Sequence, residues 1–148
     1  MSRFYILILL FRDKQGGIIM NNAKSFDEKI SKIVKKGMIK VGDVVLVNCT
    51  PHQLDIVQQD GSIVKIDSCG IIPRCSSSEV VDQAIGLIEV TKQTLGAVEG
   101  LPEEIPGAYF IVSRLVASAA HRDDLLVPGS LIRDDQGKVI GCKGLSRI

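Results

Sequence analysis

Two short polar runs contain the residue types best suited to bind a ligand or do chemistry. The first, NCTPH at residues 48–52, lies between two apolar segments, so its side chains are expected at a strand end. Pro51 keeps Thr50 extended, and Thr50 and His52 are expected to point the same way. His52 would then hydrogen-bond an anionic or carbonyl group, or act as a base. In the structural alternative, Asn48 and Thr50 satisfy the backbone groups of a turn.

The second polar run, HRDD at residues 121–124, follows a predicted helix, and Arg133 opens a turn further along the chain. Arg122 and Arg133 would clamp a phosphate with their planar donors. Asp124 would act as an acid or base, or would bind a divalent cation together with Asp123. In the structural alternative, these charges pair with one another on a solvated surface.

Catalytic and metal-binding signatures are weak or missing. Cys49 and His52 form a C-x-x-H pair that His121 could extend, but a structural zinc site needs four convergent ligands. No P-loop, dinucleotide fingerprint, nucleophile elbow or zinc-protease motif occurs. We therefore predict no structural zinc and no cofactor, and we assign no catalytic residue.

The composition favours one β-rich domain with little attraction for nucleic acid. The chain has 148 residues, the usual size of one domain. Its 18 basic and 17 acidic residues nearly cancel, so no overall field draws it onto nucleic acid. Aromatic residues make up only 4% and Trp is missing, so Val, Ile and Leu must build the core, which favours strands. The four cysteines form no C-x-x-C pair, and we expect reduced thiols in a cytoplasmic protein.

The first nineteen residues are expected to be a translated leader. Their apolar run at residues 4–11 is too short to span a bilayer, and Arg12 follows it where a signal peptide would have a small-residue cleavage site. Residues 14–20, KQGGIIM, can be encoded by a purine-rich ribosome-binding element followed by a start codon. We therefore expect the natural product to begin at Met20. The alternative is a genuine N-terminal strand.

Residues 20–40 are expected to hold an amphipathic helix, and residues 41–148 a single β-rich domain. A capping box at Ser25 and apolar residues at helical spacing predict a helix that ends before Gly37. Asp60-Gly61 predicts a tight hairpin turn. Further strands are predicted at 43–47, 53–58, 70–75, 84–91 paired with 94–98, 109–112, 125–127, 131–132 and 139–142, with a short helix at 113–120. The predicted fold is α+β, mainly β: a compact antiparallel barrel or sandwich with two small helices.

Several segments together resemble a group of small phage and prophage proteins that carry an N-L-T-P-H segment near the N-terminus. The likeness covers roughly residues 45–148, and Cys49 departs from the leucine of that pattern. The segments that carry it are 47–52, 99–103, 109–113, 122–129 and 139–142. The resemblance implies an origin in a mobile element and no established activity.

Small phage proteins without catalytic signatures often act by binding, and one class sequesters the nucleotide second messengers of bacterial defence systems. The leading hypothesis is therefore a non-enzymatic binding protein for a phosphorylated or cyclic nucleotide ligand, working as a homo-oligomer. The candidate ligand-binding residues are Thr50, His52, Arg74, Tyr109, Ser113, Arg122, Asp124 and Arg133. The alternatives are a small hydrolase or nuclease using His52 and Asp124, and a protein-interaction module whose contact is the lysine-bearing helix.

Overall fold

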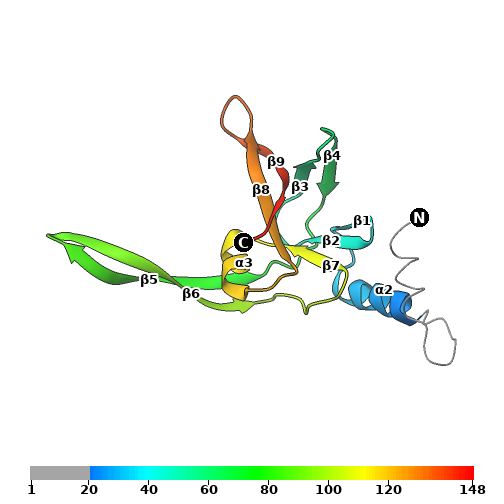
Figure 1. Ribbon diagram of the computed structural model, residues 1–148, viewed down its shortest axis with the longest axis horizontal. Helices are drawn as coiled ribbons and strands as arrows, with labels where there is room; N and C mark the ends of the chain where they lie inside the picture. Colours follow the sequence, from blue (N-terminus) through cyan, green and yellow to red (C-terminus); the bar gives the residue numbers. More distant parts are fainter. Residues whose placement is uncertain (1–20) are drawn as a thin grey trace.

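The computed structural model describes residues 21–148, which form two helices and nine strands (Figure 1). The helices are α2 (Asn21–Ile33) and α3 (Arg114–Ala120). The strands are β1 (Met38–Val41), β2 (Val44–Asn48), β3 (Leu54–Val57), β4 (Ile63–Ile66), β5 (Arg74–Ile85), β6 (Ile88–Glu99), β7 (Ala108–Ile111), β8 (Leu125–Arg133) and β9 (Val139–Ser146). The expected mainly β, α+β class is confirmed. The expected leader, residues 1–19, lies outside the described residues.

Within the described residues, seven strands form a curved, barrel-like sheet in the order β1-β2-β7-β8-β9-β3-β4 (Figure 1). β7 is parallel to both of its neighbours, β2 and β8, and β3 is parallel to β9. The expected antiparallel pairing is found for β1–β2, β3–β4 and β8–β9, and the sheet as a whole is mixed. The parallel pair β7–β8 arises because the connection between the two strands contains α3, and parallel neighbours need such a crossover.

A buried side chain joins the two ends of this curved sheet. Asn48, the last residue of β2, is fully buried, and its Nδ2 donates to the carbonyl of Ile66, the last residue of β4, at 2.9 Å. β4 is one edge of the sheet and β2 lies next to the other edge. The backbone amide of Cys69 also donates to the Asn48 carbonyl, at 2.9 Å. These bonds hold the sheet in its barrel-like form.

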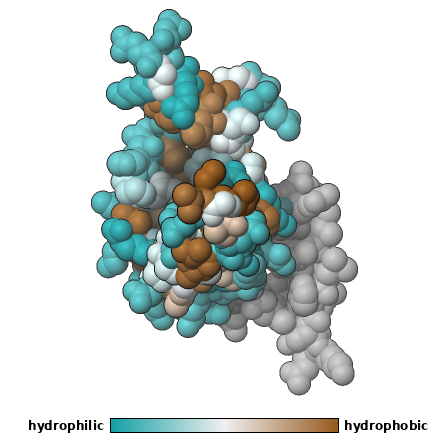
Figure 2. Space-filling view, turned by 90° about the vertical axis from the view of Figure 1, so that its left-hand side faces the viewer, coloured by the Kyte–Doolittle hydropathy of each residue, from teal (hydrophilic) through white to brown (hydrophobic). Residues whose placement is uncertain are grey.

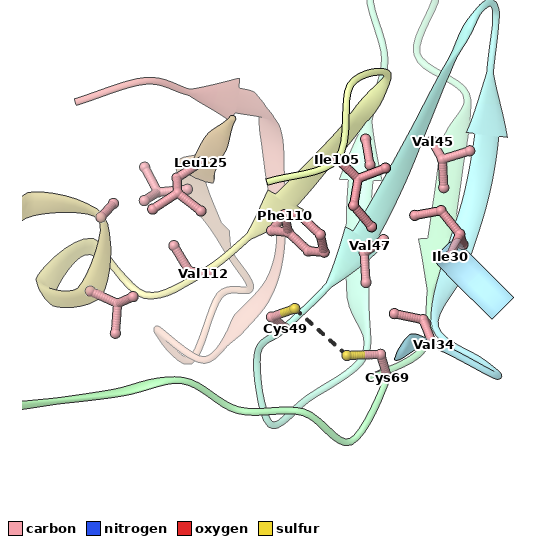
Figure 3. Close-up of a cluster of buried hydrophobic side chains, with 14 residues drawn as sticks. Ile30, Val34, Val45, Val47, Cys49, Cys69, Ile105, Phe110, Val112 and Leu125 are labelled. Carbon is pink, nitrogen blue, oxygen red and sulfur yellow. Dashed lines mark hydrogen bonds between the residues drawn. The ribbon is translucent and has the colours of Figure 1, made fainter. Parts of the chain in front are cut away.

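β7 lies between two hydrophobic clusters and is buried on both faces, as central parallel strands usually are. Phe110 belongs to the larger cluster, with Val47 and Leu125 (Figure 3). Its neighbour Ile111 belongs to the smaller cluster, with Ile66. Because successive side chains of a strand point to opposite faces, one strand contributes to both clusters. Aliphatic residues dominate both, as the scarcity of aromatic residues predicts.

Helix α2 packs against the larger cluster through the apolar face that its sequence predicts. Phe26 and Ile30 of the helix, and Val34 directly after its end, recur at helical spacing and contact this cluster. The helix nevertheless begins at Asn21, so the predicted capping box at Ser25 lies inside it, and that predicted start is wrong. The residues before the box include an alanine and a lysine, which are strong helix formers, so the chain has no reason to begin the helix later.

The largest departure from the sequence-based expectation is a long hairpin made of β5 and β6, which we call the arm. The two strands pair with each other and, within the described residues, with no third strand. The prediction of paired strands at 84–91 and 94–98 is wrong, because the turn lies at Gly86, whose φ is +62°. Residues 76–79 are polar and Ser-rich, so they carry no apolar alternation that would predict a strand.

Other local predictions are confirmed. The Asp60-Gly61 turn joins β3 to β4 as a hairpin, and α3 begins directly after Ser113. The tail differs in one respect, because β8 runs without a break through Pro128 where two shorter strands were expected. In the described part of the chain, neither helix is long and apolar enough to cross a membrane.

Gly37 is predicted to be essential for stability. Its φ of +72° is strained for other residues, and a Cβ there would overlap the backbone of Asp67 and Cys69. Gly37→Ala should therefore lower the free energy of unfolding by about 3 kcal/mol or more. Gly42→Ala is the matched control, because Gly42 has a φ of +58° but no atom near the added Cβ, and it should cost only about 1 kcal/mol. Urea denaturation measures both, and equal losses would contradict the steric argument.

Candidate functional site

The NCTPH segment forms a tightly hydrogen-bonded turn around the side chain of Asn48. Asn48 Oδ1 accepts hydrogen bonds from the backbone amide of Thr50 at 3.0 Å and from its hydroxyl at 2.6 Å. Asn48 Nδ2 also donates to the carbonyl of His52 at 2.8 Å, and Ser68 donates to the carbonyl of Thr50 at 2.6 Å. His52 itself is exposed. Asn48 and Thr50 thus satisfy backbone groups, which is the structural alternative considered above.

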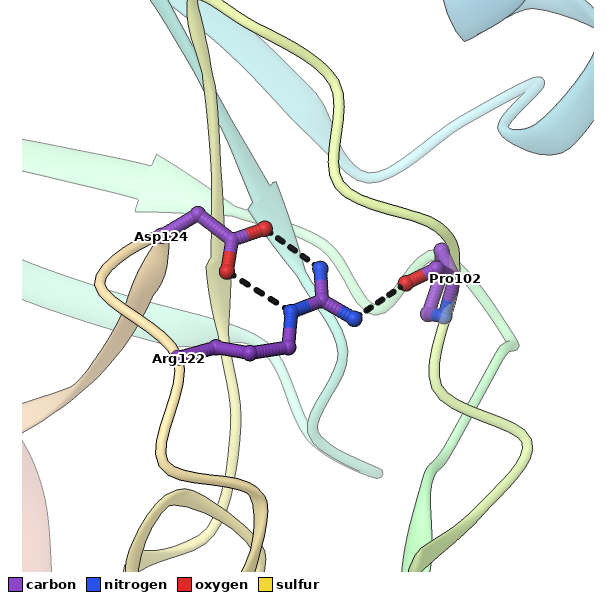
Figure 4. Close-up of polar contacts among 3 residues, drawn as sticks. All are labelled: Pro102, Arg122 and Asp124. Atoms are coloured by element: carbon purple, nitrogen blue, oxygen red, sulfur yellow. Dashed lines mark hydrogen bonds and ion pairs between the residues drawn. The ribbon is translucent and has the colours of Figure 1, made fainter.

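Arg122 and Asp124 form an ion pair that fastens two loops together (Figure 4). Arg122 Nε donates to Asp124 Oδ1 at 2.9 Å, and Nη2 donates to the second carboxylate oxygen. Nη1 donates to the carbonyl of Pro102 at 2.7 Å. These hydrogen bonds to the carboxylate raise the pKa of Arg122, and Asp124 is buried. The guanidinium predicted to clamp a phosphate is therefore committed to a carboxylate and a carbonyl of the same chain.

The other predicted ligand-binding residues lie in separate places. Ser113 caps α3, because its hydroxyl accepts from the backbone amide of Val116 at 3.3 Å. Arg133, at the end of β8, donates to the carbonyl of Gly137 across the turn at 2.8 Å. Arg74 is exposed at the base of the arm.

The structure brings only two of the predicted residues to a common hollow among the described residues. Tyr109 and Asp124 line a shallow depression of about 150 Å³, together with Glu104 and Asp123. The charged residues of its lining are all carboxylates, and Asp124 is already paired with Arg122, so the lining offers no cation to bind a phosphate. A larger groove of about 670 Å³ is lined by the ends of β3 and β9 and by the β3–β4 turn. Its lining contains none of the predicted ligand-binding residues, and its charged residues are Asp60 and Lys143.

Cys49 and Cys69 lie together in the larger cluster, with their Sγ atoms 3.7 Å apart (Figure 3). Burial, followed by the neighbouring Cys69 thiol, raises the pKa of Cys49. A buried, protonated thiol is a poor nucleophile and a poor metal ligand. Among residues 21–148, no group of three or more His, Cys, Asp or Glu side chains is placed to hold a metal ion.

The arm is attached to the body at its base, where Cys75 and Val98 pack against the larger cluster. It projects away from the body (Figure 1). Beyond the partly buried Cys75, Val90 and Val98, every residue of its two strands is exposed. An isolated two-stranded hairpin is at best marginally stable in water, because it buries neither face. Strands as long as these therefore need something to cover them.

The outer half of the arm has one strongly apolar face. Ile85 lies directly opposite Ile88, and the next positions on the same face are Gln83 with Val90, then Val80 with Lys92. Ile85 is 63% exposed and Ile88 69%. Figure 2 looks along the arm with its tip toward the viewer, and hydrophobic side chains gather there. We call Val80, Ile85, Ile88 and Val90 the apolar face of the arm.

Sequence reasoning missed the arm as a candidate site because it searched for polar residues. The detectable signal was the pair of isoleucines that flank Gly86-Leu87, a glycine turn with an exposed leucine. Comparisons of the chain with protein-family models, with curated proteins and with solved structures found no match. The resemblance to phage and prophage proteins therefore stays a prediction.

Loss of the Arg122 side chain is predicted to affect stability. Arg122→Ala would leave the buried Asp124 carboxylate without its partner and release the Pro102 loop, so the free energy of unfolding should fall by about 2 to 3 kcal/mol. Arg133→Ala is the control, because the exposed Arg133 makes one hydrogen bond within a turn and should cost no more than about 0.5 kcal/mol. Thermal and urea unfolding measure both. An Arg122→Ala variant as stable as the parent would show that the ion pair contributes nothing.

Proposed function

We propose that the protein is a non-enzymatic binding protein and that the arm is the element that contacts its partner. The observation that supports this is the apolar face of the arm, which is exposed on a hairpin that pairs with no third strand of the described residues. Large exposed apolar surfaces on an otherwise polar protein typically mark interaction sites. Covering a half-exposed Val or Ile side chain contributes about 1 kcal/mol, so a partner that covers this face gains several kcal/mol.

The form of the arm also favours binding of a macromolecule over binding of a small molecule. A small-molecule site is concave and surrounds its ligand, whereas the arm is a convex ribbon with two open faces and two open edges. Its unpaired strand edges offer rows of backbone donors and acceptors, which proteins use to add a strand from a partner. The partner is therefore a folded surface or an extended chain long enough to cover the ribbon.

The alternative of a hydrolase or nuclease using His52 and Asp124 has less support. Both oxygens of the Asp124 carboxylate accept hydrogen bonds from Arg122, so a base role would require breaking a charge-assisted pair. His52 does not line the hollow beside Asp124. The two residues would need to share a substrate to act as acid and base.

Sequestration of a nucleotide messenger stays a prediction whose support is the sequence alone. The described residues that would bind phosphate are spread over the body, so such a ligand would have to be held between subunits. Mass spectrometry of small molecules released by heating the protein, after incubation in lysate of defence-activated cells, tests it. A released nucleotide in stoichiometric amount would favour sequestration over the arm-based proposal.

A photo-cross-linking experiment tests whether the arm is the contact. A photoreactive amino acid at position 87, on the fully exposed tip, should form a covalent adduct of discrete mass in cells that express the native gene. The same group at Lys32, on the exposed side of α2, is the comparison, because the lysine-bearing helix is the rival contact. Adducts at position 87 but not at position 32 are expected. Adducts at position 32 alone, or none at either position, would refute the proposal.

A further inference from the structure

Two cysteines lie together at the place where the curved sheet closes. Cys49 directly follows β2, and Cys69 lies in the loop after β4. These two strands are not neighbours in the sheet. The Sγ atoms of the two residues are 3.7 Å apart inside the larger hydrophobic cluster (Figure 3). The thiol pair therefore bridges the same two parts of the chain that the side chain of Asn48 bridges.

Hydrogen bonds and close packing fix the backbone on both sides of this pair. The amide of Cys49 donates to the carbonyl of Ile111 at 2.8 Å, and the amide of Cys69 donates to the carbonyl of Asn48 at 2.9 Å. The backbone of Cys69 also packs against Gly37, where an added Cβ would come within 2.5 Å of the Cys69 Cα. The fold itself therefore holds the two side chains next to each other.

The contact between the sulfurs is close to the geometry of a disulfide bond. A disulfide needs its sulfurs about 2.0 Å apart, so the two atoms would have to approach by about 1.7 Å. Cys69 lies between residues 67 and 73, outside any helix or strand, so its approach breaks no strand ladder. The thiol of Cys69 would give up its bond to the carbonyl of Ile71, a weak thiol hydrogen bond of 3.5 Å.

The other two cysteines are placed away from this pair. Cys142 belongs to the smaller cluster, on the other face of β7. Cys75 packs at the edge of the larger cluster, where its thiol donates to two carbonyls of the arm. A disulfide within the folded body is therefore expected between Cys49 and Cys69.

We infer that Cys49 and Cys69 form a site of reversible oxidation, and that their disulfide fastens the end of β2 to the loop after β4. This inference goes beyond the proposed function, because it concerns the body of the protein and not the arm. Under reducing conditions both residues remain thiols, and the bond forms when an oxidant is supplied.

The oxidant is a small disulfide such as oxidised glutathione. Cys69 reacts first, because 8% of it is exposed against 2% of Cys49. Its thiolate attacks one sulfur of the oxidant, which forms a mixed disulfide and releases one small thiol. The sulfur of Cys49 then attacks that of Cys69 and displaces the second small thiol. The two protons lost by the cysteines end on the two released thiols, so two protein thiols are oxidised while one small disulfide is reduced.

Burial makes this reaction slow but does not make it unfavourable. It raises the pKa of Cys49, so little of that residue is in the thiolate form that attacks a disulfide. The equilibrium depends instead on what the bond does to the unfolded chain. A cross-link between residues 49 and 69 closes a loop of about twenty residues, which restricts the unfolded chain and lowers the unfolding constant by about a hundredfold.

Peptide mapping of the full chain tests whether the bond forms. Native protein is incubated with oxidised glutathione for a period long enough for slow exchange, then alkylated and cleaved with trypsin. Cleavage after Lys65 and Arg74 places Cys49, Cys69 and Cys75 on three separate peptides. Most molecules should yield a disulfide-linked pair of peptides that joins Cys49 to Cys69.

Two variants serve as controls for the mapping. Cys75→Ala removes the cysteine at the base of the arm and should keep the linked peptides. Cys69→Ala should give no linked peptide that contains Cys49. Absence of the bond in the parent, even after refolding from urea in the same oxidant, would overturn the inference and leave the two thiols as core residues only. A native-state bond from Cys49 to Cys75 or Cys142 would also overturn it.

Urea unfolding tests whether the bond fastens the sheet. The unfolding constant of the oxidised parent should be about a hundredfold lower than that of the reduced parent. Cys69→Ala, and independently Cys49→Ala, should unfold alike in oxidant and in reductant. If either variant fails to fold, the two forms of the parent still decide the outcome, because they are compared directly. A bond that forms but leaves stability unchanged, or lowers it, would overturn the fastening role.

Discussion

The side chain of Asn48 holds together parts of the chain that no backbone ladder connects. It bonds to the end of β4 through Ile66, to the loop after β2 through His52, and to Thr50 within that loop. Its donors and its acceptor are all used, as a fully buried amide requires. A shorter or apolar side chain would leave the carbonyl of Ile66 without this bond at the place where the curved sheet closes. The polar segment at residues 48–52 therefore has a structural role, which is to hold the barrel-like sheet closed.

Most of the other polar residues that the sequence suggested as ligand-binding groups also make structural hydrogen bonds. Arg122 and Asp124 tie the Pro102 loop to the start of β8, and Ser113 starts α3. Asp124 is buried, and an unsatisfied carboxylate there would cost more than the hydrogen bonds themselves contribute.

The arm follows the opposite rule. Its residues satisfy one another across a single pair of strands and leave apolar side chains in water. The body contains the hydrophobic clusters and anchors the base of the arm, whereas the arm carries an exposed apolar face. The polar residues of the body are accordingly used in structural hydrogen bonds.

The sequence by itself determined the elements whose signals are local. Helical spacing identified the buried face of α2, Asp60-Gly61 identified the β3–β4 turn, and the run before Ser113 predicted β7 followed by α3. The mainly β class followed from an aliphatic composition with few aromatic residues. Local signals are sufficient for these features because a turn, a cap or an amphipathic face depends on residues close together in the chain.

Only the tertiary structure decided which strands pair, where the polar residues go and what stays exposed. The parallel pairs around β7 depend on residues far apart in sequence, and the Asn48–Ile66 bond joins strands that are not neighbours in the sheet. The arm was missed because both its faces are open to water, so no core imposes an alternating pattern on its residues. Arg122 looked available for a ligand because its bond to the carbonyl of Pro102 crosses between distant loops. The burial of a side chain and the pairing of strands and polar groups depend on contacts between residues far apart in the chain, so they cannot be read from local sequence patterns.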